Sequence, residues 1–277
     1  MLTLPHGLSR AALAAVADLE RRVLAVDGGR LKLEWPVLRA RSGRRQQDVL
    51  AWQDNRLVGF LGTYAFGAAT VELAGMVDSE ARRRGTGTAL LAAGLRLSGG
   101  AALLVVPRSA QGGHAFAGAH GGELSHSEHA LVLTGPPSPG SAGPDLELRH
   151  ARPGDVPRIT ALLAEGFGAA QDPAEVARRL GDTFVAVRGG EVVATLRVER
   201  DGDIGGVYGF VVKPTLQGRG IGRDILRRVC RSLSDDGTTR VGLEVATTNE
   251  RALGLYTSLG FRPVATEDYY AVAAAPS

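Results

Sequence analysis

A glycine-rich turn stands out in Gln217-Gly218-Arg219-Gly220-Ile221-Gly222, directly after an apolar strand and before a helix. Glycine has no Cβ atom, so a ligand can approach its backbone closely. The first N–H groups of a helix have no intrahelical partners and carry partial positive charge, so they bind anions. The stretch predicts an anion site at a helix N-terminus, although a Gly-x-Gly turn alone also occurs in chains that bind no phosphate.

The same pattern occurs 135 residues earlier, in the turn from Arg82 to Gly87. The offset that joins Arg82 to Gln217 also aligns Trp52 with Val187. It further aligns the hairpin turn at 54–55 with the turn at 189–190. A constant offset through a hairpin, a strand and a glycine turn indicates an internal duplication.

The periodicity of apolar residues predicts the elements that position the two turns. In the first half we expect a helix over 8–26, a hairpin of 49–52 and 57–61, strands at 70–77 and 102–106, and a helix at 89–97. In the second half we expect strands at 146–149, 184–187, 192–198, 207–212 and 241–245, and helices at 155–167, 173–180, 223–233 and 250–259.

Length and composition are typical of a two-domain globular protein. The 277 residues suffice for two cores, and 44% hydrophobic with 22% charged residues excludes disordered and fibrous classes. Residues 135–145 are rich in Pro, Gly and Ser, which predicts a linker between domains at 1–134 and 146–277. A single cysteine, Cys230, forms no internal disulfide and is expected to be a small buried residue in a reducing cytosol.

Charge and hydropathy limit the partners. No apolar stretch approaches the roughly 20 residues of a membrane span, and the N-terminus lacks a secretory pattern, so we expect a soluble, cytoplasmic protein. A net charge of +3 with only 5% aromatic residues does not favour nucleic acid. The arginines at 39, 41, 44 and 45 are expected on a solvated loop.

Four motifs follow one another in the second half: the turn after Pro214, the strand Leu243-Glu244-Val245 with Asn249, the pair Ala252 and Tyr256, and Gly260-Phe261. This order resembles the GNAT superfamily of acetyl-CoA-dependent N-acetyltransferases, over residues 146–272. In residues 1–133 only the glycine motif carries the resemblance. The pair of domains is similar to the tandem arrangement of mycothiol synthases, and the second half is similar to ribosomal-protein N-terminal alanine acetyltransferases.

The resemblance implies an α/β (α+β) fold of two tandem GNAT domains, each a mixed, mostly antiparallel sheet flanked by helices. It implies acetyl-CoA as acyl donor, with its pyrophosphate on the glycine turn and its pantetheine arm along the preceding strand. The donor-binding residues implied in the second half are Phe210, Val211, Val212, Gln217, Gly218, Arg219, Gly220, Ile221, Gly222, Arg223 and Asn249. The corresponding residues of the first half are Met76, Val77, Arg82, Arg84, Gly85, Gly87 and Thr88.

Acetylation of an amine requires two proton transfers. A lysine amine has a pKa near 10.4 and an α-amine near 8, so a base must remove a proton before attack and an acid must meet the departing thiolate. The resemblance places the acid at Tyr256 and the base at Glu244. Tyr256 would show the same spacing if it only packed in a helix, and Glu244 could instead pair with an arginine. This chain has Gly206 where mycothiol synthases carry a glutamate, so the resemblance to them is weaker at this position. Asp201 and Asp203 remain alternative bases.

The first half lacks the asparagine and tyrosine expected after its glycine turn. We therefore predict that it does not catalyse, and that it either binds CoA unproductively or only packs against the second domain. Its histidines at 114, 120, 126 and 129 have no accompanying cysteine, and no carboxylate stands at ligand spacing, so no metal is predicted.

The predicted function is acetyl transfer to a primary amine of a small molecule or a peptide N-terminus, by direct attack on the thioester. The alternative is a non-catalytic acyl-CoA-binding or regulatory protein. The sequence carries no readable code for the acceptor or for the oligomeric state.

Overall fold

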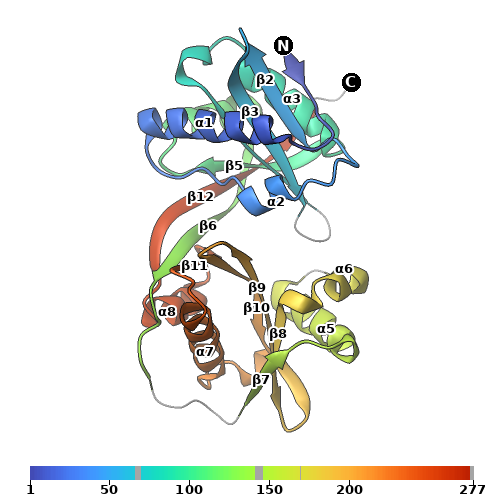
Figure 1. Cartoon of the computed structure of the whole chain (residues 1–277), viewed down its shortest axis with the longest axis vertical. Helices are drawn as coiled ribbons and strands as arrows, with labels where there is room; N and C mark the ends of the chain where they lie inside the picture. Colours follow the sequence, from blue (N-terminus) through green and yellow to red (C-terminus); the bar gives the residue numbers. More distant parts are fainter. Residues whose placement is uncertain (66–69, 141–145, 169, 275–277) are drawn as a thin grey trace. The chain divides into compact units, whose positions relative to one another are not determined.

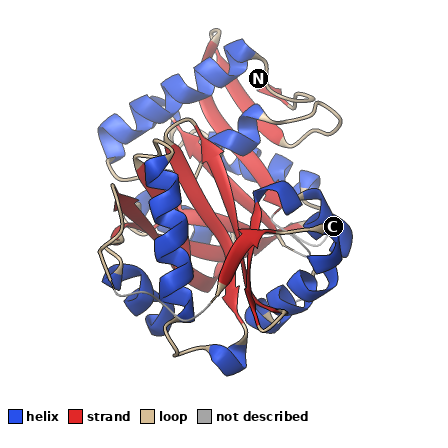
Figure 2. Cartoon of the chain, turned by 60° about the horizontal axis from the view of Figure 1, so that its bottom comes forward, coloured by secondary structure: helices blue, strands red, loops and turns tan. Residues whose placement is uncertain are grey.

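The computed structural model describes residues 1–65, 70–140, 146–168 and 170–274, in which strands are flanked by helices (Figures 1 and 2). The chain divides into two compact units. The first comprises Met1–Ser127 and Ala265–Ser277, and the second comprises Glu128–Val264.

The first unit has the strand order β1-β2-β3-β4-β5-β12. All neighbouring strands are antiparallel except β4 and β5, which are parallel. Its strands are β1 (Leu2–Thr3), β2 (Asp48–Gln53), β3 (Arg56–Ala65), β4 (Val71–Val77), β5 (Ala101–Pro107) and most of β12 (Arg262–Ala273). Its helices are α1 (Arg10–Asp27), α2 (Trp35–Arg39), α3 (Thr86–Leu97) and α4 (Gln111–Ala119).

The second unit repeats this plan with the order β6-β11-β10-β9-β8-β7, in which only β10 and β11 are parallel. Its strands are most of β6 (Glu123–Thr134), β7 (Glu147–His150), β8 (Thr183–Arg188), β9 (Glu191–Asp201), β10 (Ile204–Val212) and β11 (Arg240–Ala246). Its helices are α5 (Val156–Phe167), α6 (Pro173–Arg178), α7 (Ile221–Asp235) and α8 (Glu250–Ser258). The sheets are mixed and mostly antiparallel, so the predicted fold class is confirmed.

Each unit takes its last strand from the other half of the sequence. Strand β6 pairs with β11 from Glu128 opposite Ala246 to Thr134 opposite Arg240. Strand β12 pairs with β5 from Glu267 opposite Pro107 to Ala273 opposite Ala101. The two units therefore differ from the expected boundaries at 1–134 and 146–277, because the last strand of each half is exchanged.

Helices cover both faces of each sheet. In the second unit, α7 and α8 bury Ile225, Val229 and Tyr256 against one face, and α5 and α6 bury Leu162 and Val176 against the other (Figure 1). In the first unit, α1 and α2 share one hydrophobic cluster with the sheet and α3 shares another. Cys230 lies in the α7 cluster, and burial raises the pKa of its thiol to about 12, as expected for a small core residue.

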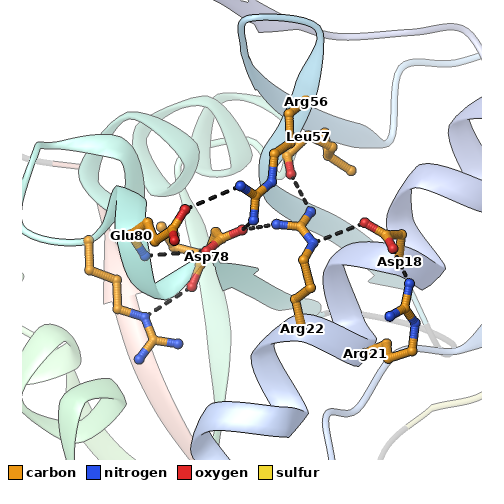
Figure 3. Close-up of polar contacts among 9 residues, drawn as sticks. Asp18, Arg21, Arg22, Arg56, Leu57, Asp78 and Glu80 are labelled. Carbon is orange, nitrogen blue, oxygen red and sulfur yellow. Dashed lines mark hydrogen bonds and ion pairs between the residues drawn. The ribbon is translucent and has the colours of Figure 1, made fainter.

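An ionic network fixes α1 to the β2–β3 turn and to the segment after β4 (Figure 3). Arg22 contacts the carboxylates of both Asp18 and Asp78, and Arg56 approaches the same Asp78 carboxylate at 3.0 Å. Asp78 is buried, so each added hydrogen bond offsets the cost of removing its charge from water. The network holds α1 beside the first glycine turn.

The duplicated position in the second unit carries the opposite charges. Arg56 and Asp78 of the first unit align with Glu191 and Lys213, at the offset of 135. Lys213 Nζ donates to Glu191 Oε1 at 2.6 Å, so the ion pair is retained with its polarity reversed. The two halves thus have the same framework but different charges beside their glycine turns.

The predicted linker and the predicted basic loop have different outcomes. Residues 135–140 have no helix or strand, and Ser138 N–H donates to the carbonyl of Leu259 in the second unit; residues 141–145 lie outside the described part. The expectation that Arg41 lies on a solvated loop is wrong, because its side chain is 4% exposed and pairs with buried Asp48 at 3.1 Å.

We expect the sequence-defined second domain, residues 146–277, not to fold cooperatively alone. It lacks β6, so β11 has an unpaired edge, and its β12 has no β5 partner. A matched fragment of residues 123–264 keeps the whole second unit with its β6, and we expect it to show a single thermal transition by far-ultraviolet circular dichroism. Equal cooperativity in both fragments would contradict the strand exchange.

Candidate active site

A β-bulge reshapes β10 just before its end. Tyr208 faces Arg197 and Val211 faces Thr195, so Gly209 and Phe210 together oppose a single residue of β9. Gly209 has φ +57°, a left-handed conformation that glycine adopts without steric cost. The extra residue reverses the alternation: Val207 packs with α7 before the bulge, whereas Phe210 and Val212 pack there after it.

The parallel pairing of β10 with β11 ends close to this bulge. In the described structure the pairs run from Ile204 and Arg240 to Gly206 and Gly242 and stop there, although β10 continues to Val212 and β11 to Ala246. The two strands therefore separate, and their backbone groups on the facing sides have no strand partner. An extended chain of another molecule can hydrogen-bond to such an edge.

The glycine turn follows β10 and begins α7, as predicted. Gly218 and Gly220 both have φ +80°, and Gly220 is the N-cap of α7. The side chain of Gln217 fixes the turn, because its Nε2 donates to the carbonyl of Val212 at 3.0 Å. The N–H groups of Ile221, Gly222 and Arg223 lie in the first turn of the helix, where no intrahelical acceptor is available.

Arg251, in the first turn of α8, contacts the glycine turn, and the sequence analysis did not predict this contact. Its Nη1 donates to Gln217 Oε1 at 3.2 Å, and its Nη2 lies 2.9 Å from where a Cβ of Gly218 would be. A cation in the first turn of a helix is unfavourable for the helix dipole, and α8 begins at Glu250. This unfavourable placement was the signal in the sequence that Arg251 serves the neighbouring turn.

The remaining predicted donor residues of the second unit divide between exposed and structural positions. Arg219 is exposed, and Arg223 donates from Nε to the hydroxyl of Ser258 at 3.1 Å. Asn249 is the N-cap of α8, since its Oδ1 accepts from the N–H of Ala252 at 3.1 Å. Val211 is buried on the α5 face and Ile221 on the α7 face.

Tyr256 lies on the α8 face of the sheet with its ring against Phe261. The residue is 8% exposed, and burial raises the pKa of its hydroxyl to about 12. Among the described residues the hydroxyl has no hydrogen-bond partner. At neutral pH the Tyr256 hydroxyl is therefore protonated, and it donates no hydrogen bond to another described residue.

Glu244 lies on the opposite face of the sheet from Tyr256. Leu243 and Val245, its neighbours in β11, are buried in the cluster that contains Tyr256, and side chains alternate along a strand. Glu244 is half-buried and stands two residues beyond Gly242, where the pairing with β10 ends. The two predicted catalytic residues thus flank the separated strands from opposite faces.

The first unit repeats the backbone of the turn. Gly85, the N-cap of α3, has φ +81°, and Arg83 has φ +60° at the position of Gly218. Arg82 Nε donates to the carbonyl of Val77 at 3.0 Å, which reproduces the contact of Gln217 with Val212. The aligned backbones support the predicted duplication.

Side chains of the first unit contact its glycine turn. The two terminal guanidinium nitrogens of Arg82, Nη1 and Nη2, donate to the carboxylate of Asp27 at 2.9 and 2.6 Å. The Thr88 hydroxyl lies 3.0 Å from His120 Nε2, and a Cβ on Gly87 would lie 3.1 Å from the Phe116 ring. Arg84 is exposed. Arg82 and Thr88, which were expected to face a donor, therefore contact the protein.

Strand β4 has no bulge. Its pairs with β3 run without a shift from Gly59 opposite Val77 to Ala65 opposite Val71. Met76 faces α1 in the hydrophobic cluster of the first unit, as the aligned Val211 faces α5 in the second. Glu72 occupies the place of Gly206, and Lys32, itself buried, lies 3.2 Å from its carboxylate. The first unit has the turn of the second without the bulged strand beside it, although its β4 and β5 also stop pairing, after Leu73 and Leu104.

Within residues 1–274, outside the gaps given above, no helix has both the length and the apolar character that crossing a membrane requires. In the same residues no group of three or more His, Cys, Asp or Glu side chains has an arrangement suited to a metal ion.

Comparison with known proteins agrees with the fold. Residues 157–261 match the model of the Acetyltransferase (GNAT) family. This match places residues 157–261, which contain the bulged strand, β11 and the glycine turn, in the GNAT family of acetyltransferases, whose members use acetyl-CoA as acyl donor.

Relatives cover nearly the whole chain. The mycothiol acetyltransferase of Acidothermus cellulolyticus is 29% identical, over 95% of this chain and 92% of that protein. A GCN5-related N-acetyltransferase from Sphaerobacter thermophilus superposes with a TM-score of 0.81 at 19% identity, covering 100% of this chain and 96% of the other. A tandem GNAT protein from the clavulanic acid biosynthesis pathway gives 0.70 at 18% identity, covering 100% of both chains. These structures show that the tandem GNAT fold is shared.

We expect Gly222→Ala to weaken CoA binding without destabilising the fold. Its Cβ would lie 3.4 to 3.5 Å from Leu255, Phe210 and Val212, which is ordinary contact, and alanine is favoured in a helix by about 1 kcal/mol. The methyl group would instead obstruct an anion approaching the first turn, so we expect the Kd for CoA measured by calorimetry to rise at least about tenfold.

Gly254→Ala is the matched control, because it makes the same change within α8 where no atom lies within 4 Å of the added Cβ. It should raise the melting temperature slightly and leave the Kd for CoA unchanged. An unchanged Kd in Gly222→Ala would show that the anion does not contact this turn.

Proposed function

We propose that the chain transfers the acetyl group of acetyl-CoA to a primary amine, and that the donor site and the chemistry lie in the second unit. The observation that carries this proposal is the separation of β10 from β11, with Tyr256 on one face and Glu244 on the other. A thioester between the strands is accessible to both groups. The acceptor would be a small-molecule amine or a peptide N-terminal amine.

The donor fits the residues along this path. Its pyrophosphate would bind to the N–H groups of Gly220 to Arg223, with Arg219 and Arg251 supplying positive charge. Its pantetheine arm would pair with the free edge of β10 near Phe210 and Val212. Backbone N–H groups at the bulge would stabilise the oxyanion, an effect of about 3 kcal/mol per donor.

The reaction requires the amine to lose a proton and the sulfur to gain one. Glu244 would accept the proton of the attacking amine, directly or through water, on its face of the sheet. The nitrogen then forms a bond to the carbonyl carbon, and the carbon–sulfur bond breaks as the tetrahedral intermediate collapses. Tyr256 would donate its proton to the departing thiolate on the opposite face. The products are the acetylated amine and CoA with a free thiol.

The first unit is proposed to bind no donor. Arg82, which would face the phosphates of a donor, is engaged with Asp27, and Arg56 is engaged with Asp78 and Glu80. Phe116 and His120 cover the start of α3. A polyphosphate would have to displace these contacts before it could bind to the turn. The resemblance of the second half to ribosomal-protein N-terminal alanine acetyltransferases stays a prediction.

A non-catalytic acyl-CoA-binding protein is the alternative, and it predicts tight CoA binding without release of the thiol on any amine. The name of the Acidothermus relative refers to mycothiol. Gly206 supplies no glutamate at the position that mycothiol synthases use, so we propose an amine acceptor without naming it.

Tyr256→Phe and Glu244→Gln test the two assigned roles. Each should lower kcat by about a hundredfold, because a positioned acid or base contributes roughly 10²–10⁴ in rate. The loss of kcat in Glu244→Gln should become smaller as the pH rises toward the pKa of the free amine, because the amine then loses its proton to the solvent without the help of a base. Glu147→Gln, in β7, is a matched strand control that should retain the wild-type rate.

The pH profile separates the tyrosine from the glutamate. Because burial raises the pKa of Tyr256 to about 12, its hydroxyl stays protonated through the accessible range, so kcat/KM should show no descending limb below about pH 10. A descending limb near pH 8 that is lost in Tyr256→Phe would contradict the assigned environment. Unchanged rates in both variants would refute the assigned roles.

A further inference from the structure

Two glycines lie opposite each other where β10 and β11 last pair. Gly206 faces Gly242 across the parallel ladder, on the face of the sheet that also carries Tyr208 and Glu244. Side chains two residues apart on a strand share a face, so Tyr208 follows Gly206 and Glu244 follows Gly242 on the two sides of the separation. The tyrosine and the glutamate therefore flank a floor made of backbone.

The Tyr208 ring lies over Gly206. A Cβ on Gly206 would lie 2.7 Å from both Cε2 and the hydroxyl oxygen of Tyr208, which is closer than a carbon atom can approach. Gly206 is thus required by the ring above it. The Tyr208 hydroxyl lies in the space that a side chain at position 206 would fill.

Arg197 holds this ring from the neighbouring strand. It pairs with Tyr208 across the β9–β10 ladder, and its guanidinium carbon lies 4.9 Å from the ring centroid. Arg197 Nη1 donates to Glu199 Oε1 at 2.6 Å, and Arg179 contacts the same carboxylate at 2.7 Å. The guanidinium is therefore fixed by an ion-pair network and stacks against the ring from the side away from β11.

The space above Gly242 is different. The nearest atoms to a Cβ at this position are backbone oxygens of Gly205 and Leu131, both at 3.9 Å, and no described side chain of the unit lies within 4 Å. An added methyl group would fit there without displacing protein atoms. The fold does not require glycine at 242 for packing or for backbone conformation.

We propose that Tyr208 positions the acceptor, and that the amine nitrogen binds above Gly242 between the Tyr208 hydroxyl and the Glu244 carboxylate. The inference rests on the proposed function and names the acceptor side of the same site. A primary amine can donate hydrogen bonds to both oxygens, and it lies on the face of the sheet opposite Tyr256. Gly242 is kept free of a side chain so that the nitrogen can reach the thioester.

Gly242→Ala tests the space, with Gly205→Ala as its matched control. Gly205 lies next to Gly206 on the opposite face, where a Cβ would make ordinary contacts of 3.4 and 3.5 Å with Thr238 and Leu233. Rates would be measured with glucosamine, the dipeptide Ala-Ala and n-butylamine, using the amine of highest kcat/KM. We expect Gly242→Ala to raise the KM for that amine at least about tenfold, with the Kd for CoA and the melting temperature unchanged. Gly205→Ala should leave all of these values unchanged.

Tyr208→Phe tests the hydroxyl while keeping the ring over Gly206 and against Arg197. We expect kcat/KM for the amine to fall about tenfold and the Kd for CoA to stay constant. Gly206→Ala should also lower kcat/KM by displacing the ring, and it should add no further loss in a Tyr208→Ala background.

These measurements distinguish a failure of the acceptor placement from a failure of the acetyltransferase function. If the wild type releases thiol with an amine but Gly242→Ala and Tyr208→Phe keep its amine KM and kcat/KM, the acceptor placement is wrong and the acetyltransferase function stands. If the wild type releases no thiol with any of the three amines while binding CoA tightly, the proposed function is contradicted, and the acceptor placement with it.

Discussion

The separation of β10 from β11 is the constraint on which the rest of the second unit depends. A parallel ladder that continued beyond Gly206 and Gly242 would satisfy the backbone of both strands and leave no edge for a donor. The bulge at Gly209 follows the last pair of β10 with β11, and its extra residue exchanges the faces on which the side chains of β10 lie. The glycine turn, α8 and β11 are then placed around a gap that the sheet itself produces.

Duplication and divergence are both visible in this geometry. The two glycine turns share their left-handed residues and the contact that fixes each turn to the preceding strand. What differs is the neighbouring strand and the charge: β4 pairs with β3 without a bulge, and Asp78 stands where the second unit has Lys213. A turn with the geometry of an anion site is therefore not sufficient for one, since the groups around it decide whether an anion is favoured.

Local signals in the sequence predicted most elements and both turns. The hairpins, the strand before each turn and the helices α3 and α7 depend on residues close in sequence, so periodicity and glycine spacing reveal them. The exchange of β6 and β12 depends on pairing between distant residues, which no local pattern encodes. The boundaries at 134 and 146 followed composition, and composition does not record which strand a segment pairs with.

Within the site, residue types were predictable and their surroundings were not. Tyr256 and Glu244 were identified from motif order, but only the alternation of β11 shows that they lie on opposite faces. Arg41 belongs to a basic cluster in the sequence, yet it is buried against Asp48, because a carboxylate from β2 meets it in the folded chain. Arg251 and Tyr208 carry no motif, and their relevance follows from the glycines beside them.

We propose that the second unit alone receives the acyl donor. Hydrogen–deuterium exchange of the full chain, with and without CoA, measures this most directly because it reports both turns in one experiment. We expect CoA to slow exchange at residues 209–223 and to leave residues 77–88 unchanged. Protection confined to residues 77–88, or equal protection of both segments, would contradict the account.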